Sequence, residues 1–142
     1  MAAITPYATN HEGLGELDSR LVEVNSLPWI PTRYKGIEMK ILLEDKETGM
    51  ITALFRWQPN SRLPLHEHTE IEQTYVLEGS IEDEAGEVTA GNYIWRPAGS
   101  RHEARSRNGA LILSFFLRPN KFFDDGDGWL PSGNVGENTK VY

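Results

Sequence analysis

Eight prolines are spread along the 142 residues of this chain, and they limit the secondary structure that it can form. A proline removes one backbone donor and clashes with the preceding helical turn, so a helix rarely continues through it. The prolines are Pro6, Pro28, Pro31, Pro59, Pro64, Pro97, Pro119 and Pro131. The best helical candidate is therefore only a short turn near residues 12–17, and we expect a fold made mainly of strands.

Short segments rich in β-branched and aromatic residues alternate with turn residues from Ile37 to Arg118, which is typical of strands. The Asn108-Gly109 pair predicts a type I′ hairpin turn, because both central residues of that turn need a positive φ. Closely spaced antiparallel strands predict an all-β sandwich or small barrel, in which the inward residues would build a site. The expected strands are Ile37–Leu43, Ile51–Trp57, Leu63–His68, Glu72–Asp83, Glu87–Ala90, Tyr93–Arg96, Arg101–Arg107 and Ala110–Arg118.

Length and composition predict one domain and exclude several classes of function. A chain of 142 residues can bury a sizeable core without disulfides, so we expect a single domain over residues 1–142. Its barrel would span about 37–118, between an irregular N-terminal segment and an irregular tail, Asp124–Tyr142. With no cysteine, disulfides, thiolate nucleophiles and Cys-based metal sites are excluded. Any chemistry must therefore come from histidines and carboxylates.

Charge and hydropathy indicate the surroundings of the protein. Twenty-one acidic and fourteen basic side chains give a net charge of −7, which is the wrong sign for binding nucleic acid. No signal-peptide core is found near the start, and the longest apolar run is far shorter than a membrane span. We therefore expect a cytoplasmic protein that binds neither membranes nor nucleic acid.

Three of the four histidines lie in or beside the predicted strands. His66 and His68 are two residues apart, so on a strand they point to the same face and come within reach of one metal ion. Glu72 could add a carboxylate and His102 a third imidazole. Nitrogen-rich ligation suits Fe(II), Mn(II), Ni(II), Cu(II) or Zn(II) better than Ca(II) or Mg(II). A lone His-x-His pair could equally be a solvated surface pair, and His11 has no partner at ligand spacing.

Two gapped motifs contain these histidines. The run from His66 to Glu72 reads HxHxxxE and is followed after six residues by Gly79, and Gly91 opens a Gly-x5-Pro-x-Gly-x2-His pattern that ends at His102. Together they resemble the two cupin motifs. The resemblance implies a double-stranded β-helix, a jelly-roll-like barrel with an interior partly open to ligand. It also implies one divalent metal per chain, with the candidate ligands His66, His68, Glu72 and His102.

Two positions depart from the family pattern, because Asn60 replaces the opening glycine and Ser106 the closing asparagine. Neither position binds metal, and asparagine tolerates a positive φ. Residues 74–79 and 90–102 are similar to small single-domain acetylacetone-cleaving (β-diketone) dioxygenases, and also to the cupin domain of zinc-binding anti-sigma factors. In the diketone-cleaving group three histidines hold iron. Glu72 could therefore bind metal directly, or could hydrogen-bond a metal-bound water or a ligand imidazole.

Parity along the strands suggests what else would face the metal. Ala104 and Ser106 share the face of His102, and Thr74 and Val76 share that of Glu72. These small side chains would leave room for a substrate or simply fill the barrel. Arg96 precedes the Pro97 turn; pointing inward it could neutralise an enolate or carboxylate, and pointing outward it would be a rim charge.

The resemblance implies a non-haem Fe(II) dioxygenase that uses dioxygen to cleave a carbon-carbon bond in a small enolisable, β-diketone-like substrate. Zinc, nickel or manganese could occupy the site in purified protein. Two alternatives stay open: a non-enzymatic metal-binding cupin acting as a small-molecule sensor or binding module, and a Zn- or Mn-dependent isomerase or hydrolase. The resemblance also implies a homodimer. Leu27–Ile30 would either form part of its interface or lie as a strand on its own barrel.

Overall fold

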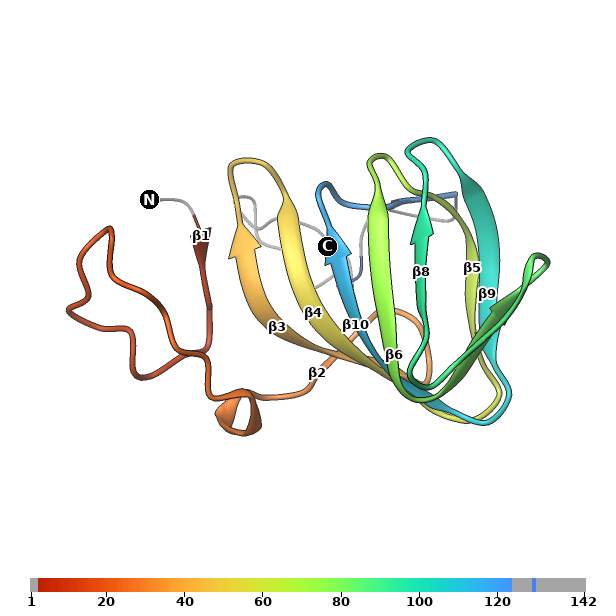
Figure 1. Cartoon of the computed structure of the whole chain (residues 1–142), viewed down its shortest axis with the longest axis horizontal. Coiled ribbons are helices and arrows are strands. Elements are labelled where there is room, and N and C mark those ends of the chain that lie inside the picture. Colours follow the sequence, from red (N-terminus) through yellow and green to blue (C-terminus); the bar gives the residue numbers. More distant parts are fainter. Residues whose placement is uncertain (1–2, 124–128, 130–142) are drawn as a thin grey trace.

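The computed structural model describes residues 3–123 and Trp129, and its regular structure is almost entirely β (Figure 1). Within these residues the only helix is the 3-10 turn η1 (Val24–Ser26), and no helix is long and apolar enough to cross a membrane. The strands are β1 (Ala3–Ile4), β2 (Ile30–Pro31), β3 (Ile37–Asp45), β4 (Met50–Trp57), β5 (Ser61–Glu67), β6 (Glu72–Asp83), β7 (Gly86–Thr89), β8 (Tyr93–Arg96), β9 (Arg101–Ser106), β10 (Ala110–Phe116) and β11 (Lys121–Phe122).

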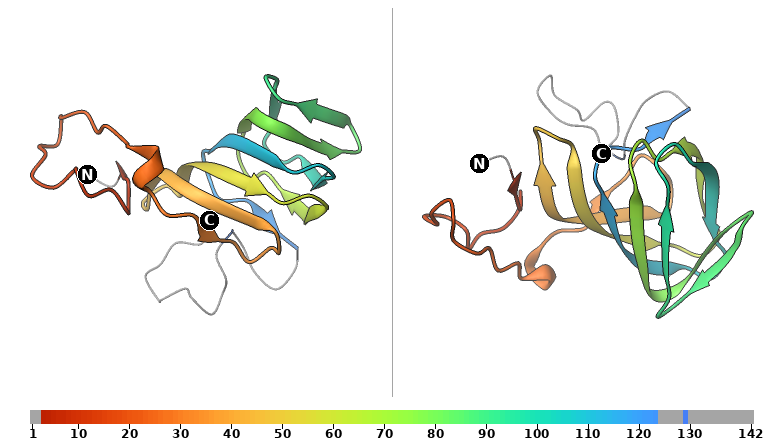
Figure 2. Two further views of the ribbon diagram at one scale, coloured as in Figure 1. Left: turned by 90° about the horizontal axis from the view of Figure 1, so that it is seen from below. Right: turned by 45° about the horizontal axis from the view of Figure 1, so that its top comes forward.

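The strands pair antiparallel in one curled sheet with the order β1-β3-β4-β10-β6-β9-β5-β11, and β2 lies on β3 while β7 and β8 lie on β6. The curl brings β5 and β9 around to face the β3-β4-β10-β6 side, which gives an all-β barrel (Figures 1 and 2). Inner side chains from both sides meet in one apolar core. The prediction of an all-β barrel is confirmed.

Alternation along β4 shows how the sequence builds the inner wall. Ile51, Ala53, Phe55 and Trp57 are buried, whereas the residues between them are partly exposed. A strand with one buried face has this period of two. Phe116 of β10 lies edge-on to Phe55, with 5.9 Å between the ring centroids. Aromatic side chains therefore fill one end of the barrel interior.

A β-bulge in β5 brings its functional residue to the inner face. The β5–β9 register shifts between Leu63 and His66, and both side chains are buried although they are three residues apart. Without the bulge, strict alternation would place them on opposite faces. Asn60, just before β5, has a φ of 65°. The asparagine that replaces the family's glycine thus adopts the backbone conformation that favours glycine.

Several predicted details are wrong. Residues 12–17 form turns rather than a helical turn. Asn108 does not have a positive φ, although Gly109 does, so their turn is not type I′. The strands that this turn joins, β9 and β10, do not form a hairpin, because they lie on opposite sides of β6. The two-residue strands β1, β2 and β11 were not expected from the sequence because segments so short carry no periodicity.

The structure describes only one of the two segments that we predicted to lie outside the barrel. Ile30 of β2 pairs with Met39, and the ring of Trp29 lies 4.2 Å from the Arg56 guanidinium carbon. The segment Leu27–Ile30 therefore lies on its own barrel, which was the alternative to an interface element. The predicted irregular tail, 124–142, lies outside the described residues except for Trp129.

Candidate metal centre

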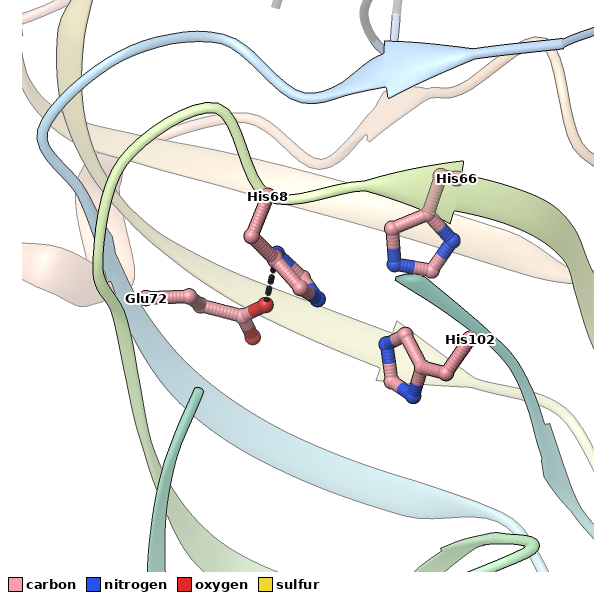
Figure 3. Close-up of side chains that lie close together, drawn as sticks. All are labelled: His66, His68, Glu72 and His102. Carbon is pink, nitrogen blue, oxygen red and sulfur yellow. Dashed lines mark ion pairs between the residues drawn. The ribbon is translucent and has the colours of Figure 1, made fainter. Parts of the chain in front are cut away.

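Three histidines and one glutamate meet inside the barrel (Figure 3). His66 near the end of β5 lies directly opposite His102 of β9 in the strand register, and His68 follows just after β5. The three ring centroids are 4.5–4.9 Å apart. Glu72 enters from the start of β6. All four side chains are buried, and one possible ligand atom from each lies within 4.8 Å of the others.

Hydrogen bonds at Nδ1 set the tautomer of each imidazole. Nδ1 of His66 lies 2.9 Å from the Pro64 carbonyl oxygen, and Nδ1 of His102 lies 2.8 Å from Oδ2 of Asp83. Because these oxygens only accept, each Nδ1 carries the proton and each Nε2 keeps a free lone pair. Nδ1 of His68 lies 2.7 Å from Oε2 of Glu72 and donates in the same way. The three Nε2 atoms are therefore all available as ligands.

Nε2 of His68 is the observation that best tests whether a metal fits. This atom is completely buried, and among the described residues it has no hydrogen-bond partner. A buried polar atom without a partner is costly, and such atoms usually face a water or an ion that the protein binds. Three imidazole nitrogens with a nearby carboxylate match the donor set of Fe(II), Mn(II) or Zn(II). The residues present thus fit a divalent metal ion.

The surroundings hold His66 and His102 in the neutral form that binds metal. Burial lowers the pKa of His66 to about 3, and the nearby His102 adds to this shift. Burial also lowers the pKa of His102, with a second contribution from the Arg96 guanidinium. A charged imidazolium loses hydration inside the barrel, which explains the direction of both shifts. At neutral pH both side chains are therefore uncharged.

Comparison with known proteins agrees with the fold and the motifs. The family of ChrR cupin-like domains matches residues 18–119. This chain belongs to that cupin family. No curated protein matches it at the sequence level. The match covers both gapped motifs and the strands β2 to β10.

Solved structures with similar folds are only about one-fifth identical to this cupin. A candidate acetylacetone dioxygenase from Methylibium petroleiphilum has 20% identity and a TM-score of 0.72, over 82% of this chain and 92% of that chain. The acetylacetone dioxygenase from Acinetobacter johnsonii has 20% identity and a TM-score of 0.62, over 94% and 87%. The Rhodobacter sphaeroides complex of SigE with the anti-sigma ChrR gives 22% identity and a TM-score of 0.56, over 66% and 50%. At these identities the likeness shows a shared fold.

Glu72 of this cupin is engaged at both carboxylate oxygens. Oε2 accepts the hydrogen bond from His68, and Oε1 accepts one from the Thr74 hydroxyl at 2.8 Å. Burial by itself would raise the pKa of Glu72, but its hydrogen bonds and the charges of His68 and Arg96 outweigh burial and lower it to about 2. In this arrangement the ionised carboxylate orients a candidate ligand imidazole, the second of the two roles expected for it.

Arg96 points into the barrel and lies between two carboxylates. Its side chain is 10% exposed; Nη1 lies 3.5 Å from Oε1 of Glu72, and Nη2 lies 3.6 Å from Oδ2 of Asp83. The rim position considered from the sequence is therefore wrong. Burial would raise the pKa of Asp83, but the hydrogen bond from His102, with smaller contributions that include the charge of Arg96, lowers it. His68, Glu72, Arg96, Asp83 and His102 thus form one continuous polar chain around the candidate site.

A narrow cavity adjoins the histidines. Its volume is about 20 Å³, enough for about one water molecule, so the interior is less open than the resemblance implies. Trp129 fills the neighbouring space, with its ring centroid 4.6 Å from that of Phe55. The residues that parity placed inward are all buried, but of these only Ala104 lines the cavity. The apolar lining residues are Phe55, Trp57, Leu63, Ile81, Ala104, Ile112, Phe116 and Trp129.

Two residues of the site escaped the sequence analysis. Asp83 is eleven positions from Glu72, so simple alternation would place the two side chains on opposite faces of β6. A β-bulge in β6 shifts this alternation by one residue. Asn120 lies between β10 and β11, and its Oδ1 is 3.2 Å from Nδ1 of His68. Neither stands in a motif that would mark it. His11 lies apart from the cluster and contacts the Leu21 carbonyl oxygen, in agreement with the expectation that it is not a ligand.

Proposed function

We propose that this cupin is a mononuclear, metal-dependent dioxygenase that cleaves a carbon-carbon bond in a small enolisable substrate of the β-diketone class. The observation that carries the proposal is the convergence of three imidazoles, one with a buried and unpartnered Nε2, beside an apolar cavity. The similar folds of two proteins described as established or candidate acetylacetone dioxygenases support it. We propose Fe(II) as the physiological metal, with zinc, nickel or manganese able to replace it.

The histidines would hold the metal, and the groups behind them would keep these ligands in place. His66, His68 and His102 present Nε2, while the Pro64 carbonyl, Glu72 and Asp83 accept from Nδ1 and prevent ring rotation. When bound, Fe(II) would supply redox electrons and a Lewis acid that favours the enolate form of the substrate. The apolar lining would exclude bulk water and strengthen every charge interaction in the cavity.

Glu72 and Arg96 have proposed roles toward substrate and metal. Both residues line the cavity. We propose that the Arg96 guanidinium stabilises the negative charge of a bound enolate and at the same time holds Glu72 and Asp83 in position. Glu72 either keeps its place behind His68 or becomes a fourth ligand, and the second role requires its carboxylate to leave Nδ1 of His68. Glu72→Gln should then lower metal affinity by about 10- to 100-fold or more, measured by competition with a chelator.

Metal content and oxygen uptake test the proposed activity. Protein prepared without contact with nickel resin would be analysed for metals, stripped, reloaded with Fe(II) and given a panel of β-diketones. We expect one metal per chain and the consumption of one dioxygen per diketone cleaved, with both oxygen atoms recovered in the products. A cupin that binds one Fe(II) but consumes no dioxygen with any member of the panel would refute the proposed reaction.

A second candidate function has a specific observation in its favour. The cavity of about 20 Å³ is smaller than any diketone, so a substrate can enter only if neighbouring side chains move. A cavity this small suits a non-enzymatic metal-binding module that acts as a sensor. Binding of zinc without turnover of the panel would favour this function, while hydration or isomerisation of a carbonyl by the Zn- or Mn-loaded protein would favour an isomerase or hydrolase.

We also propose that two copies of this cupin associate in the cytoplasm. Tyr75 of β6 lies opposite Tyr93 of β8 in the register, and Trp95 follows on the same outer face; the three side chains are 42%, 50% and 55% exposed. Neighbouring exposed aromatic residues are typical of protein contacts. Sedimentation equilibrium should give the mass of a dimer, and Trp95→Glu should weaken it. A monomer at high concentration would contradict the proposal, and cell fractionation would test the location.

A further inference from the structure

Asn120 is a buried amide beside the candidate metal centre, and its two ends have different surroundings. The residue lies in the connection between β10 and β11, is only 2% exposed and lines the cavity. Its Oδ1 lies 3.2 Å from Nδ1 of His68. Its Nδ2 is completely buried, and within the described part of the chain this group has no hydrogen-bond partner. One half of the amide is thus satisfied by the protein, and the other half is not.

The orientation of this amide follows from the proton on His68. Nδ1 of His68 lies 2.7 Å from Oε2 of Glu72, and a carboxylate oxygen accepts a hydrogen bond, so Nδ1 carries a hydrogen. Asn120 must then turn its oxygen, and not its NH2 group, toward that hydrogen. Nδ2 consequently faces away from His68. If the amide were reversed, its NH2 group would face the Nδ1 hydrogen of His68, and two donors would meet. The oxygen and nitrogen of the Asn120 amide are therefore assigned by this contact.

None of the other polar groups that line the cavity forms a hydrogen bond with Nδ2. Glu72 accepts from His68 and Thr74, and Ser114 is hydrogen-bonded to the Thr74 hydroxyl at 2.7 Å. His66 and His102 use Nδ1 toward their own acceptors. Arg96 carries donors only. A buried donor left unpaired costs free energy, so the group that completes this site must bring an acceptor atom.

We infer that Asn120 is a ligand-binding residue: Nδ2 donates a hydrogen bond to an oxygen atom of a small bound molecule, while Oδ1 positions His68. The ligand class is an organic molecule with a carbonyl, enolate or carboxylate oxygen. The cavity has room for about one water molecule, and the ligand oxygen would occupy this space. For a β-diketone ligand the inference rests on the proposed function; for a carboxylate it does not.

Two substitutions separate the two halves of the amide. Asn120→Asp keeps an oxygen for the His68 hydrogen but replaces the Nδ2 donor by a second acceptor. Asn120→Ala removes both groups and adds no charge, which covers the case in which the aspartate variant folds poorly. Asn92 provides matched controls, because it is exposed and its amide only contacts Thr89 in a turn. Asn92→Asp and Asn92→Ala should therefore behave like the wild type.

The experiment uses Zn(II)-loaded full-length protein and two probes, pentane-2,4-dione and acetate. Titration calorimetry gives the Kd of each probe, chelator competition gives the Kd of zinc, and the side-chain amide signal of Asn120 is followed by NMR. We expect a probe to shift this signal in the wild type. Its Kd should rise about 10-fold in Asn120→Ala and further in Asn120→Asp, while the zinc Kd of Asn120→Asp stays within about 3-fold.

The outcomes distinguish the inference from the proposed function. Diketone binding that is equal in the wild type and both Asn120 variants would overturn the inference and leave the proposed function intact; Nδ2 would then serve only a water molecule. Acetate binding that depends on Asn120, without any diketone binding, would support the inference and remove the proposed substrate. Binding of neither probe by the zinc-loaded wild type would overturn both.

Discussion

Each histidine of the candidate metal centre is oriented through Nδ1 by a different kind of acceptor. His66 uses a backbone carbonyl, His68 a carboxylate together with the Asn120 amide, and His102 the carboxylate of Asp83. Backbone carbonyls are hard to remove by mutation, whereas carboxylates are not. The contribution of orientation to metal affinity can therefore be measured at Asp83 without touching a candidate ligand.

Asp83→Ala should weaken metal binding by about 10- to 100-fold, because His102 loses the acceptor that fixes its tautomer and ring orientation. The affinity for Zn(II) would be measured by competition with a chelator of known strength. Glu103→Ala is the matched control, since this acidic residue lies next to His102 on β9 but only pairs with Arg62 at the surface. An unchanged zinc Kd in Asp83→Ala would show that orientation through Asp83 is unimportant.

Glu44 is a buried acid far from the histidines in the sequence, and it should give the protein a pH-dependent stability. Its side chain is 2% exposed; burial raises its pKa above the usual 4.5, opposed in part by Lys46 at 3.9 Å. A raised pKa in the folded state means that Glu44 contributes stability below about pH 4.5, which is lost as pH rises through the folded-state pKa. Ionisation of this buried group therefore opposes folding at neutral pH.

Comparison with Glu44→Gln isolates this effect, because the amide does not titrate. The free energy of unfolding of the variant relative to the wild type should increase between pH 4 and pH 7, by about 1.4 kcal/mol for each unit of pKa shift. Urea unfolding at several pH values provides the measurement. Glu47→Gln, at an exposed acid in the turn that follows β3, is the matched control. A difference that is constant with pH would mean that Glu44 titrates normally in the folded protein.

At the scale of elements, β6 connects the site to the fold. It begins at Glu72, carries Thr74 on its inner face and ends at Asp83, so one strand supplies both carboxylates that contact Arg96. Gly79 lies where β6 passes the start of β10. A Cβ atom at Gly79 would lie 2.0 Å from the carbonyl oxygen of Gly109. The glycine of the first motif is thus needed for this close contact between backbones.

Gly79→Ala should be strongly destabilising, by roughly 2–5 kcal/mol, because it combines a backbone clash with a φ of 68° that suits glycine. Thermal unfolding and soluble yield would both be measured. Gly91→Ala is the matched control: its φ is 86°, but a Cβ there would meet nothing within 4 Å. If the two variants lost the same stability, the loss in Gly79→Ala would come from its backbone conformation alone, and the clash with β10 would add nothing to it.

At the scale of the whole molecule, the apolar core and the candidate metal centre are separate sources of stability. The core cluster contains Met39, Ala53, Phe55 and Val76, each at most 1% exposed, and it runs through both sides of the barrel. A domain of this length with such a core does not depend on a metal to fold. The barrel itself should thus survive without the ion.

Removal of the metal by chelation should therefore abolish the proposed activity and leave the fold. We expect the metal-free protein to unfold cooperatively, with a loss of stability that follows from ligand linkage, about 2.7 kcal/mol relative to protein at a metal concentration of 100 times Kd. Circular dichroism and calorimetry of the stripped and reloaded protein would measure this. If the stripped protein unfolded without a cooperative transition, the metal would instead be structural. Activity of the stripped protein would exclude a catalytic role for the metal.

Local patterns in the sequence predicted much of the fold and part of the site. The period-two alternation and the turn residues predicted β6 and β8 with their observed bounds and most other strands to within two residues. The HxH spacing and the two gapped motifs predicted that His66, His68, Glu72 and His102 come together, as they do. The strands and the HxH spacing could be predicted because the side-chain direction on a strand depends only on near neighbours in the chain, whereas the meeting of His102 with this pair was implied by the resemblance to the cupin motifs.

The tertiary structure decided what depends on distant contacts. The bulges in β5 and β6 change the parity of Leu63 and Asp83. The separation of β9 from β10 by β6 excludes the hairpin that Asn108-Gly109 predicted, since strand order depends on the path of the whole sheet. The ion pairs of Arg96 and the small volume of the cavity likewise arise only when side chains from several strands pack together. Both depend on residues that are far apart in the chain, so no single segment of sequence predicts them.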